Sequence, residues 1–425
     1  MRALLVSAGY GEAAEVDGAD VIIVNTCSFL ASATSESIET TLELADEVAA
    51  GVRSKPIIMC GCVPSRYGDE LAPELPEVAA FVRADEEDGI VEVVSKVLGT
   101  NAPGISLGDG RVLRTVEGTS AYVKISDGCD RFCTFCAIPY IRGRYASRSA
   151  EEIVDEVHAL MEGGVREIVL IGQDTGVWGC DLPGTPTLAS LLREVAHAVR
   201  PYGGWVRVLY LQPEGMTDEL IATIRDVDEV LPYIDIPIQH CNERILREMN
   251  RSGSADELRS LFARLRREIP GMVLRTTGMA GFPTETDDEA DELATFLAEQ
   301  AFDYTSVFAY SPEEGTIAGD MDGQIDEDVK LERTQRLIDI AEAAGFAATA
   351  RHVGERVKVI IDGVEESEQG VELIGHAWFQ APDCDGAVHI EEGEAAVGDI
   401  VTCDLTDAFC YELLGVIVND ERSES

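Results

Sequence analysis

The strongest constraint on the fold is a repeated alternation of apolar runs and amphipathic patterns through the middle of the chain. Six apolar runs have the length of a strand, and they span residues 122–126, 167–172, 206–211, 233–238, 272–279 and 304–309. The intervening segments carry apolar side chains at helical spacing, and three of them open on a Ser/Thr-x-x-Glu capping pattern, at Ser149, Ser254 and Thr286. Strands that alternate with helices form a parallel sheet. Six repeats rather than eight predict an α/β chain with a partial TIM-type (βα)6 barrel, open on one side.

Three cysteines follow the first predicted strand at the spacing Cys129-x3-Cys133-x2-Cys136. Thiolates are the usual ligands of iron–sulfur clusters. Three of them can bind three irons of a 4Fe–4S cluster and leave the fourth iron open to another ligand. A zinc knuckle and three unrelated buried thiols are the alternatives, but zinc needs a fourth ligand and the loop holds no further cysteine or histidine. The spacing therefore predicts a cluster at the carboxyl end of a barrel strand, where such folds place their chemistry.

Polar and glycine-rich segments follow other predicted strands. Gln173 and Asp174 come after the second strand and offer an amide and a carboxylate to the polar groups of a cofactor. Gly278 and Gly281 come after the fifth, where glycine lets the backbone approach a ligand closely. An ordinary turn explains each pair equally well. His240, after the fourth strand, is predicted to be structural rather than a general base.

Arg142 and Arg144 lie just past the cysteine loop. Both are placed to meet a carboxylate, although an ordinary turn is again the alternative.

Residues 1–98 are predicted to form a small Rossmann-like α/β unit. Two continuous apolar runs suit buried parallel strands, and they span residues 19–25 and 55–59. These strands end near Cys27 and Cys62, and the carboxyl ends of parallel strands are where open sheets bind ligands. Two thiols at neighbouring strand ends fit a second cluster as well as they fit ordinary buried cysteines.

Residues 99–119 are rich in Gly, Pro and polar residues and are predicted to be a linker.

The last part of the chain has a different pattern from the alternating core. Residues 351–420 contain short strands separated by turn residues, which predicts a small antiparallel β-barrel. From residue 353 on there are 18 acidic and three basic residues. The net charge of this part is therefore negative, which disfavours binding to a phosphate backbone. The barrel is therefore expected to bind a basic protein.

Composition limits the class of protein. The chain has 79 acidic and 33 basic residues, and its net charge of −46 makes direct nucleic-acid binding an unfavoured function. No apolar run approaches the length of a membrane span. The apolar run at the start of the sequence is too short for a secretory signal. We expect a cytoplasmic chain with no membrane partner and with reduced cysteines. The scattered cysteines are predicted to be packing residues, namely Cys180, Cys241, Cys384, Cys403 and Cys410.

The cysteine spacing, with Phe135 before the last cysteine, resembles the cluster loop of the radical S-adenosylmethionine (SAM) enzymes. The resemblance implies that the open iron binds the amino and carboxylate groups of SAM and that Phe135 lies near its adenine. It also implies that an electron from the cluster cleaves SAM to a 5′-deoxyadenosyl radical.

Longer strings resemble the RimO branch of the methylthiotransferases, and they span residues 136–148, 172–175, 232–240 and 310–316. The resemblance implies a methylthiotransferase α/β domain at residues 1–98, a radical SAM core at 120–350 and a TRAM β-barrel at 351–420. It implies methylthiolation of an aspartate β-carbon on protein twelve of the ribosomal small subunit, a basic protein, with an electron donor protein as a further partner. A tRNA adenosine methylthiotransferase and a non-catalytic cluster-binding ribosome adaptor are the alternatives.

The resemblance also implies two 4Fe–4S clusters. Cys129, Cys133 and Cys136 hold the first, and Cys27 and Cys62 match ligand positions of the second. The second carries the sulfur that one SAM methylates, while a deoxyadenosyl radical from another SAM takes hydrogen from the aspartate.

One departure concerns the start of the chain. The family has a first strand and a third N-terminal cysteine that this sequence lacks, and residues 1–10 resemble the family's first helix. A start site placed too late in the sequence is the expected cause, and substitution by Cys60 is the alternative.

Overall fold

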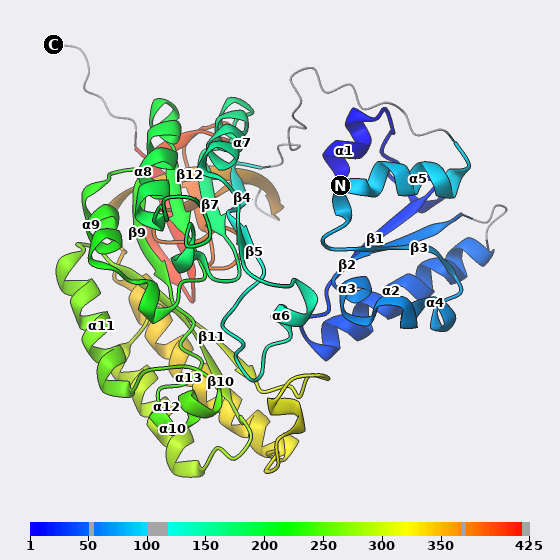
Figure 1. Cartoon of the computed structure of the whole chain (residues 1–425). Coiled ribbons are helices and arrows are strands. Elements are labelled where there is room, and N and C mark those ends of the chain that lie inside the picture. The colour runs from blue at the N-terminus through cyan, green and yellow to red at the C-terminus, as the bar shows by residue number, and fades with distance from the viewer. Residues whose placement is uncertain (51–54, 101–117, 368–369, 419–425) are drawn as a thin grey trace. The chain divides into compact units, whose positions relative to one another are not determined.

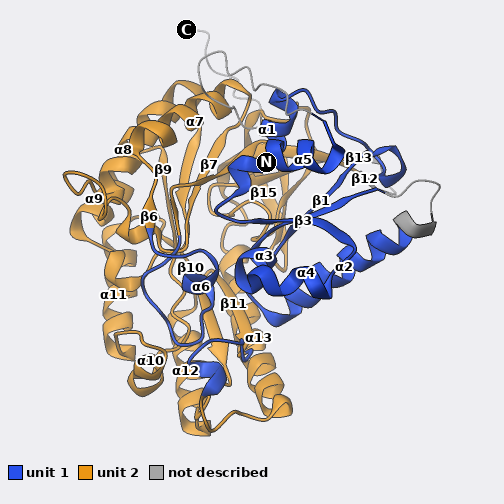
Figure 2. Cartoon of the chain, turned by 45° about the vertical axis from the view of Figure 1, so that its right-hand side comes forward, with its two compact units in different colours: residues 1–115, 128–145, 311–320 blue, residues 116–127, 146–310, 321–425 orange. Residues whose placement is uncertain are grey.

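The computed structural model describes residues 1–50, 55–100, 118–367 and 370–418 (Figure 1). They form two compact units, each built from separate stretches of sequence (Figure 2). Unit 1 comprises Met1–Thr115, Gly128–Tyr145 and Ser311–Asp320, and unit 2 comprises the rest. The predicted linker lies almost entirely outside the described residues. In the described part of the chain, no helix is both long and apolar enough to cross a bilayer.

Unit 1 contains a parallel sheet of three strands in the order β1-β2-β3. Its strands are β1 (Ile22–Thr26), β2 (Ile57–Gly61) and β3 (Val78–Arg83), and its helices are α1 (Arg2–Ser7), α2 (Ala31–Ala50), α3 (Cys62–Tyr67), α4 (Leu71–Glu74), α5 (Ile90–Leu98) and α6 (Ile138–Ile141). Successive strand side chains point to opposite faces. Ile58 and Cys60 therefore pack in one buried cluster with residues of α5, whereas Met59 packs in another with residues of α3 and α4. Covered on both faces, the sheet has the predicted Rossmann-like character.

Unit 2 contains a six-stranded sheet in the order β11-β10-β9-β8-β7-β4, and all neighbouring pairs are parallel. Its strands are β4 (Ser120–Lys124), β7 (Glu167–Ile171), β8 (Trp205–Val208), β9 (Val230–Asp235), β10 (Val273–Ala280) and β11 (Tyr304–Ala309). Its helices are α7 (Ala150–Glu162), α8 (Leu188–Val199), α9 (Asp218–Asp226), α10 (Glu243–Glu248), α11 (Ala255–Glu268), α12 (Asp287–Gln300) and α13 (Glu327–Ala350). The edge strands β4 and β11 do not pair with each other, so the sheet is the predicted partial barrel.

The predicted helix starts are largely confirmed. Ser149 and Thr286 form reciprocal capping boxes at α7 and α12. Ser254 caps α11 by accepting a hydrogen bond from the Glu257 backbone. These caps fix where the connecting loops begin and so help to set the carboxyl edge of the sheet.

The C-terminal strands close into a barrel in the order β12-β13-β14-β16-β15, as predicted. They are β12 (Arg356–Ser367), β13 (Gly370–Ala377), β14 (Val388–Glu392), β15 (Ile400–Phe409) and β16 (Glu412–Ile417). Four pairs are antiparallel and the β14–β16 pair is parallel. Asp362 and Gly363 are a residue pair typical of turns, but in the structure they lie inside β12 at a register shift, because a bulge accommodates glycine as readily as a turn does.

The two faces of the six-stranded sheet have different partners. One face carries Val123, Leu170 and Val206 among others, and packs against the helices. The opposite, inner face carries Tyr233 and Tyr304, which share a buried cluster with residues of the terminal barrel. The terminal barrel therefore fills part of the inside of the partial barrel.

A buried ion-pair network joins these two parts of unit 2. Arg207 Nε donates to Glu167 Oε1 at 2.6 Å, and neither side chain is exposed. Arg207 Nη2 also donates to the carbonyls of Trp378 and Gln380, at 3.0 and 2.8 Å. His376 lies with Nε2 2.8 Å from Glu167 Oε2. Because Arg207, Glu167 and His376 are all buried, the network ties the terminal barrel to β7 and β8.

Candidate functional site

The cysteine loop is held in shape by its backbone. It occupies Gly128–Tyr145 of unit 1, and the Cys129 N–H donates to the Gly143 carbonyl at 3.3 Å to close its base. Gly128 has a φ of +71°, and a Cβ there would lie 2.3 Å from the Arg144 carbonyl oxygen. Only glycine fits this position. The Cys136 N–H donates to the Cys133 carbonyl at 3.0 Å, which forms a tight turn between these two cysteines.

The three thiols are placed for ligation rather than for packing. Cys129, Cys133 and Cys136 are all partly exposed and none is in a disulfide bond, which contradicts the alternative of unrelated buried thiols. A zinc knuckle needs a fourth ligand, and the loop holds no further cysteine or histidine. A cubane cluster needs a wider arrangement, because each thiolate binds a different iron. The donor set therefore fits an iron–sulfur cluster.

Aromatic and charged side chains border the loop. Phe132 has a left-handed backbone with φ +49°, and its ring lies edge-on to Tyr140 with centroids 6.4 Å apart. Arg144 lies over the Phe132 ring at 5.4 Å and pairs with Asp130 at 3.0 Å. Phe135, the predicted adenine neighbour, is partly exposed between the second and third cysteines. Arg144 thus has a carboxylate partner inside the loop itself.

Cys27 and Cys62 are neighbours at the carboxyl edge of the unit 1 sheet. The parallel pairing of Thr26 with Gly61 places the residue that follows β1 beside the first residue of α3. Thr26 Oγ1 donates to the Cys60 carbonyl at 2.6 Å and accepts from the Val63 N–H at 3.1 Å, which fixes this turn. Cys27 is exposed and Cys62 is 7% exposed.

Cys60 is a poor substitute ligand. Its side chain lies on the face of β2 that packs against α5, in a cluster of apolar side chains, and is 0% exposed. Burial, with a smaller contribution from the Glu87 carboxylate, raises the pKa of its thiol to about 12. A thiol in this environment stays protonated, whereas a metal ligand must be a thiolate.

Arg142 connects the cysteine loop to the N-terminal cysteines. Its Nη2 donates to Cys62 Sγ at 3.3 Å. Cys62 also packs against Ala137 and Ile141, on and beside α6. The structure gives Arg142 a sulfur atom as one partner, and the carboxylate expected from the sequence stays a prediction. Within unit 1, two cysteine sites that are about 70 residues apart in sequence are therefore brought together.

Sequence reasoning missed a buried ion pair that organises this region. Arg66 Nη1 pairs with Glu313 Oε2 at 3.0 Å, and the side chains are 7% and 2% exposed. Glu313 Oε1 accepts from the Ala31 N–H at 2.9 Å, at the start of α2. The Ala318 N–H, from the same segment, donates to the Thr134 carbonyl at 2.9 Å. The only sequence signal was the string at residues 310–316, which gave no partner for its glutamate.

The carboxyl edge of the unit 2 sheet carries the remaining candidates. Asp174 is 2% exposed, and the amide oxygen of Gln173 is buried without a hydrogen-bond partner among the described residues. Gly278 has open space around its missing Cβ, with a single atom at 3.8 Å. Gly281 differs, because its φ is +77° and a Cβ would lie 2.2 Å from Cγ of Lys330. Glycine is required at position 281 by the protein's own packing.

His240 is buried in a structural setting. It is 0% exposed, its Nδ1 accepts from the Asn242 N–H at 2.9 Å, and its Nε2 faces Glu285 Oε1 at 3.3 Å. An acceptor Nδ1 places the proton on Nε2, toward the carboxylate. Glu285 Oε2 also accepts from the Gly281 N–H at 2.9 Å. This arrangement agrees with the structural role predicted for His240.

Three of the five scattered cysteines are exposed. Cys241 and Cys403 are buried as predicted, but Cys180, Cys384 and Cys410 are not. The prediction was wrong for these three because they lie in connections between elements, where composition gives no information on burial.

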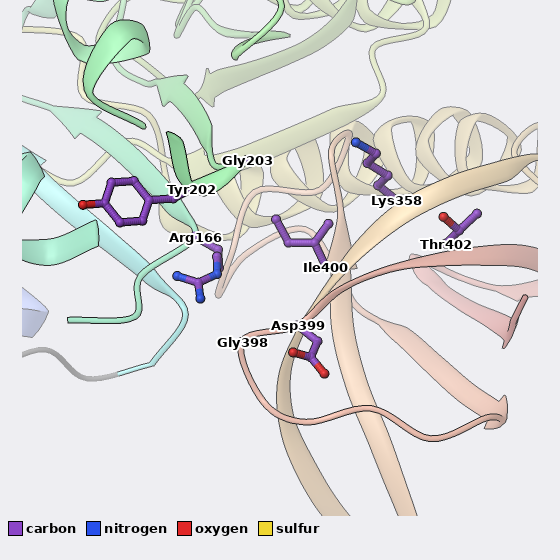
Figure 3. Close-up of a pocket in the computed structure, with 8 residues that line it drawn as sticks. All are labelled: Arg166, Tyr202, Gly203, Lys358, Gly398, Asp399, Ile400 and Thr402. Carbon is purple, nitrogen blue, oxygen red and sulfur yellow. The ribbon is translucent and has the colours of Figure 1, made fainter. Parts of the chain in front are cut away.

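A hollow of about 330 Å³ lies at the opposite, amino edge of the unit 2 sheet (Figure 3). It is lined by Arg166, Tyr202, Gly203, Lys358, Gly398, Asp399, Ile400 and Thr402. Arg166 and Gly203 precede β7 and β8. Barrel chemistry occurs at the carboxyl edge, so we do not assign the reaction to this hollow.

Comparison with known proteins decides the family. Three family profiles match, namely the Radical SAM superfamily over residues 123–297, Uncharacterized protein family UPF0004 over residues 1–83 and the TRAM domain over residues 353–418. The chain is 42% identical over 409 residues to "Ribosomal protein uS12 methylthiotransferase RimO" of Geobacter sulfurreducens, covering 94% of this chain and 91% of the relative. The chain belongs to the RimO family.

Other members of the family give the same result. Those of Trichlorobacter lovleyi and Thermosynechococcus vestitus are each 40% identical and cover 99% and 98% of this chain, and 94% and 93% of their own length. Among solved structures, the radical SAM methyltransferase TsrM from Kitasatospora setae matches with a TM-score of 0.54 at 15% identity, over 72% of this chain and 67% of its own. That likeness supports the fold alone. The chain is thus a radical SAM enzyme of the predicted fold class.

Proposed function

We propose that this chain methylthiolates an aspartate of the small-subunit ribosomal protein uS12 by radical SAM chemistry. Membership of the RimO family supports the reaction, since the relatives carry that activity in their names. The structural observation that carries the proposal is the Arg142–Cys62 contact, because it joins the cysteine loop to the N-terminal cysteines within one unit.

The residues assigned to the cofactors are the following. Cys129, Cys133 and Cys136 hold a 4Fe–4S cluster with one iron left for SAM, and Cys27 and Cys62 contribute to a second cluster. Phe135, Gln173, Asp174, Gly278 and Gly281 contact SAM. The first cluster supplies, when bound, the electron that cleaves SAM reductively.

The chain's own residues do the remaining work. Arg142 donates a hydrogen bond to the sulfur of Cys62 and so holds this side chain beside the cysteine loop. Arg66 and Glu313 hold the strand-end turns of unit 1 in register with the cysteine loop. Glu285 fixes the backbone of Gly281 at the strand end assigned to SAM. The acidic terminal barrel suits a basic ribosomal protein rather than RNA.

The domain limits follow the same assignment. A methylthiotransferase α/β domain spans residues 1–98, a radical SAM core spans 120–350 and a TRAM barrel spans 351–420. An electron donor protein is the further partner.

Two measurements test the proposal. Mass spectrometry of uS12, incubated with reconstituted protein, SAM, a sulfide source and a reductant, is expected to show a methylthio adduct on one aspartate. An unchanged peptide contradicts the proposal, and an adduct on tRNA instead assigns the chain to the tRNA-modifying branch.

Iron and sulfide per chain after anaerobic reconstitution test the cluster count. Two 4Fe–4S clusters require about eight irons, whereas one requires about four. The Cys129→Ala variant is expected to lose the first cluster and to retain the iron of the second.

A further inference from the structure

Tyr210, two residues after the end of β8, has a strained backbone and an exposed side chain. Its backbone is left-handed, with φ +62°, although bulky side chains disfavour that region. The residue is 46% exposed. A strained backbone conformation of this kind persists only where the surrounding residues hold it in place, and such conformations are often found at functional sites.

Three segments enforce this conformation. The Tyr210 N–H donates to Asp235 Oδ2 at 3.1 Å, and the neighbouring Leu211 N–H donates to the Asp235 carbonyl at 2.9 Å. On the other side, the Tyr210 carbonyl accepts from the Thr175 N–H at 3.2 Å. The ends of β7, β8 and β9 are thus linked through one residue.

Asp235 is itself supported from the terminal barrel. Its side chain is buried, and Oδ1 lies 3.9 Å from Arg275 Nε without a hydrogen-bond partner in the described part of the chain. Arg275 binds Asp385 of the terminal barrel and donates to Ser306 Oγ at 3.1 Å. Burial raises the pKa of Asp235 to about 6, although the Arg275 charge opposes the shift. The side chain that positions Tyr210 therefore depends on charges from two domains.

A second aromatic residue is exposed along the same edge. Phe308 lies near the end of β11 and is 51% exposed. By strand alternation it shares a face with Tyr304 and Ser306, which point to the inside of the partial barrel. The carboxyl edge, where barrel enzymes bind substrates, thus presents two large rings in a chain of net charge −46.

We propose that Tyr210 contacts the peptide segment of the protein substrate, and that Asp235 holds it in position. This inference rests on the proposed function. An exposed tyrosine offers a ring face to aliphatic side chains and a hydroxyl to a peptide carbonyl, which is why tyrosine is enriched at protein interfaces. Burial, with a contribution from the Asp235 carboxylate, raises the pKa of the Tyr210 hydroxyl, so it remains a donor at neutral pH.

The test uses the full-length reconstituted protein and purified uS12. Tyr210→Asn and Tyr210→Gly remove the ring but suit a left-handed backbone, so strain is relieved rather than added. We expect each to weaken uS12 binding and raise the KM for uS12 about tenfold or more, with the SAM affinity unchanged. Tyr210→Phe keeps the ring and is expected to stay within about threefold of the wild type.

Two substitutions test whether Asp235 positions Tyr210, one that keeps the hydrogen-bond acceptor and one that removes it. Asp235→Asn keeps an oxygen that accepts from the Tyr210 N–H, so we expect near wild-type uS12 binding. Asp235→Leu removes the acceptor and is expected to match the ring-deleted variants. A purely structural role for Asp235 would instead lower thermal stability in both Asp235 variants without a selective change in the KM for uS12.

Tyr202 provides the matched control. It lies before β8, at the amino edge of the same sheet, and is partly exposed (Figure 3). Tyr202→Asn is expected to leave uS12 binding unchanged. The inference is overturned if the wild type binds and modifies uS12 but both ring-deleted variants bind it within twofold of the wild type, or if they lose SAM affinity instead. If the wild type neither binds nor modifies uS12, the proposed function itself fails.

Discussion

Replacement of Arg207 by Met tests how the terminal barrel is held. Arg207 is fully buried and donates to Glu167 and to two carbonyls of the terminal barrel, those of Trp378 and Gln380. In the variant, His376 is the charged partner that the Glu167 carboxylate retains among the described residues. Both carbonyls lose the hydrogen bond that Arg207 donates. Removing one partner of a buried ion pair costs about 3–5 kcal/mol. We expect a loss of that size, because the methionine fills much of the volume but satisfies none of these groups.

Urea unfolding followed by tryptophan fluorescence measures this loss in unit 2 alone. All three tryptophans, Trp178, Trp205 and Trp378, lie in that unit. The Glu167→Leu/Arg207→Met double variant is expected to recover much of the stability, since both charges are then removed together. The Arg200→Met variant removes a pair with Glu229 in which the arginine side chain is 60% exposed, and it is the control, for which we expect a much smaller loss. A loss in Arg207→Met no greater than in Arg200→Met would refute the reasoning.

Four further predictions follow from contacts described above. Although burial opposes the shift, hydrogen bonds to Asp362 and Glu167 raise the pKa of His376 from 6.5 to about 9, so its contribution to stability is complete below pH 6.5 and is lost as the pH rises through 9; a melting-temperature profile should show this alkaline loss, and His376→Gln should flatten it. Although burial opposes the shift, Arg207 and His376 lower the pKa of Glu167 from 4.5 to about 2, so its contribution to stability is complete above pH 4.5 and is lost as the pH falls through 2, and urea unfolding at a series of acidic pH values should show this loss. Cys60→Ala should leave the iron content per chain unchanged, whereas Cys62→Ala should lower it, and equal iron loss in the two variants would contradict the assignment of Cys62. Gly128→Ala should lower the iron content of the cysteine loop while the fluorescence-detected unfolding of unit 2 stays near that of the wild type, because the added Cβ collides with the Arg144 carbonyl within unit 1.

The architecture could be predicted because its signals are local. Apolar runs of strand length and capping residues such as Ser149 and Thr286 report on a few neighbouring positions, and the structure places strands and helices there. The spacing of Cys129, Cys133 and Cys136 is local in the same sense. The structure shows that the three cysteines are partly exposed, and their role as cluster ligands stays a prediction.

The features that escaped prediction depend on contacts between distant segments. Arg207 and Arg275 stand inside apolar strands, and nothing nearby in sequence indicates that Trp378 and Asp385 are their partners. The left-handed backbone of Tyr210 has no composition signal, because it is imposed by Asp235 from the next strand. The exclusion of Cys60 as a ligand required knowing which face of β2 it occupies.

The inner face of the partial barrel has a consequence for protein engineering. Residues 376–385 supply an imidazole, two carbonyls and a carboxylate to Glu167, Arg207 and Arg275. A chimera that exchanged the TRAM barrel for that of another family would remove His376 from Glu167, Asp385 from Arg275 and two carbonyl acceptors from Arg207, although Glu167 and Arg207 would still pair with each other. The donor barrel would have to bring an equivalent of residues 376–385 with it. The terminal barrel is therefore not a portable module.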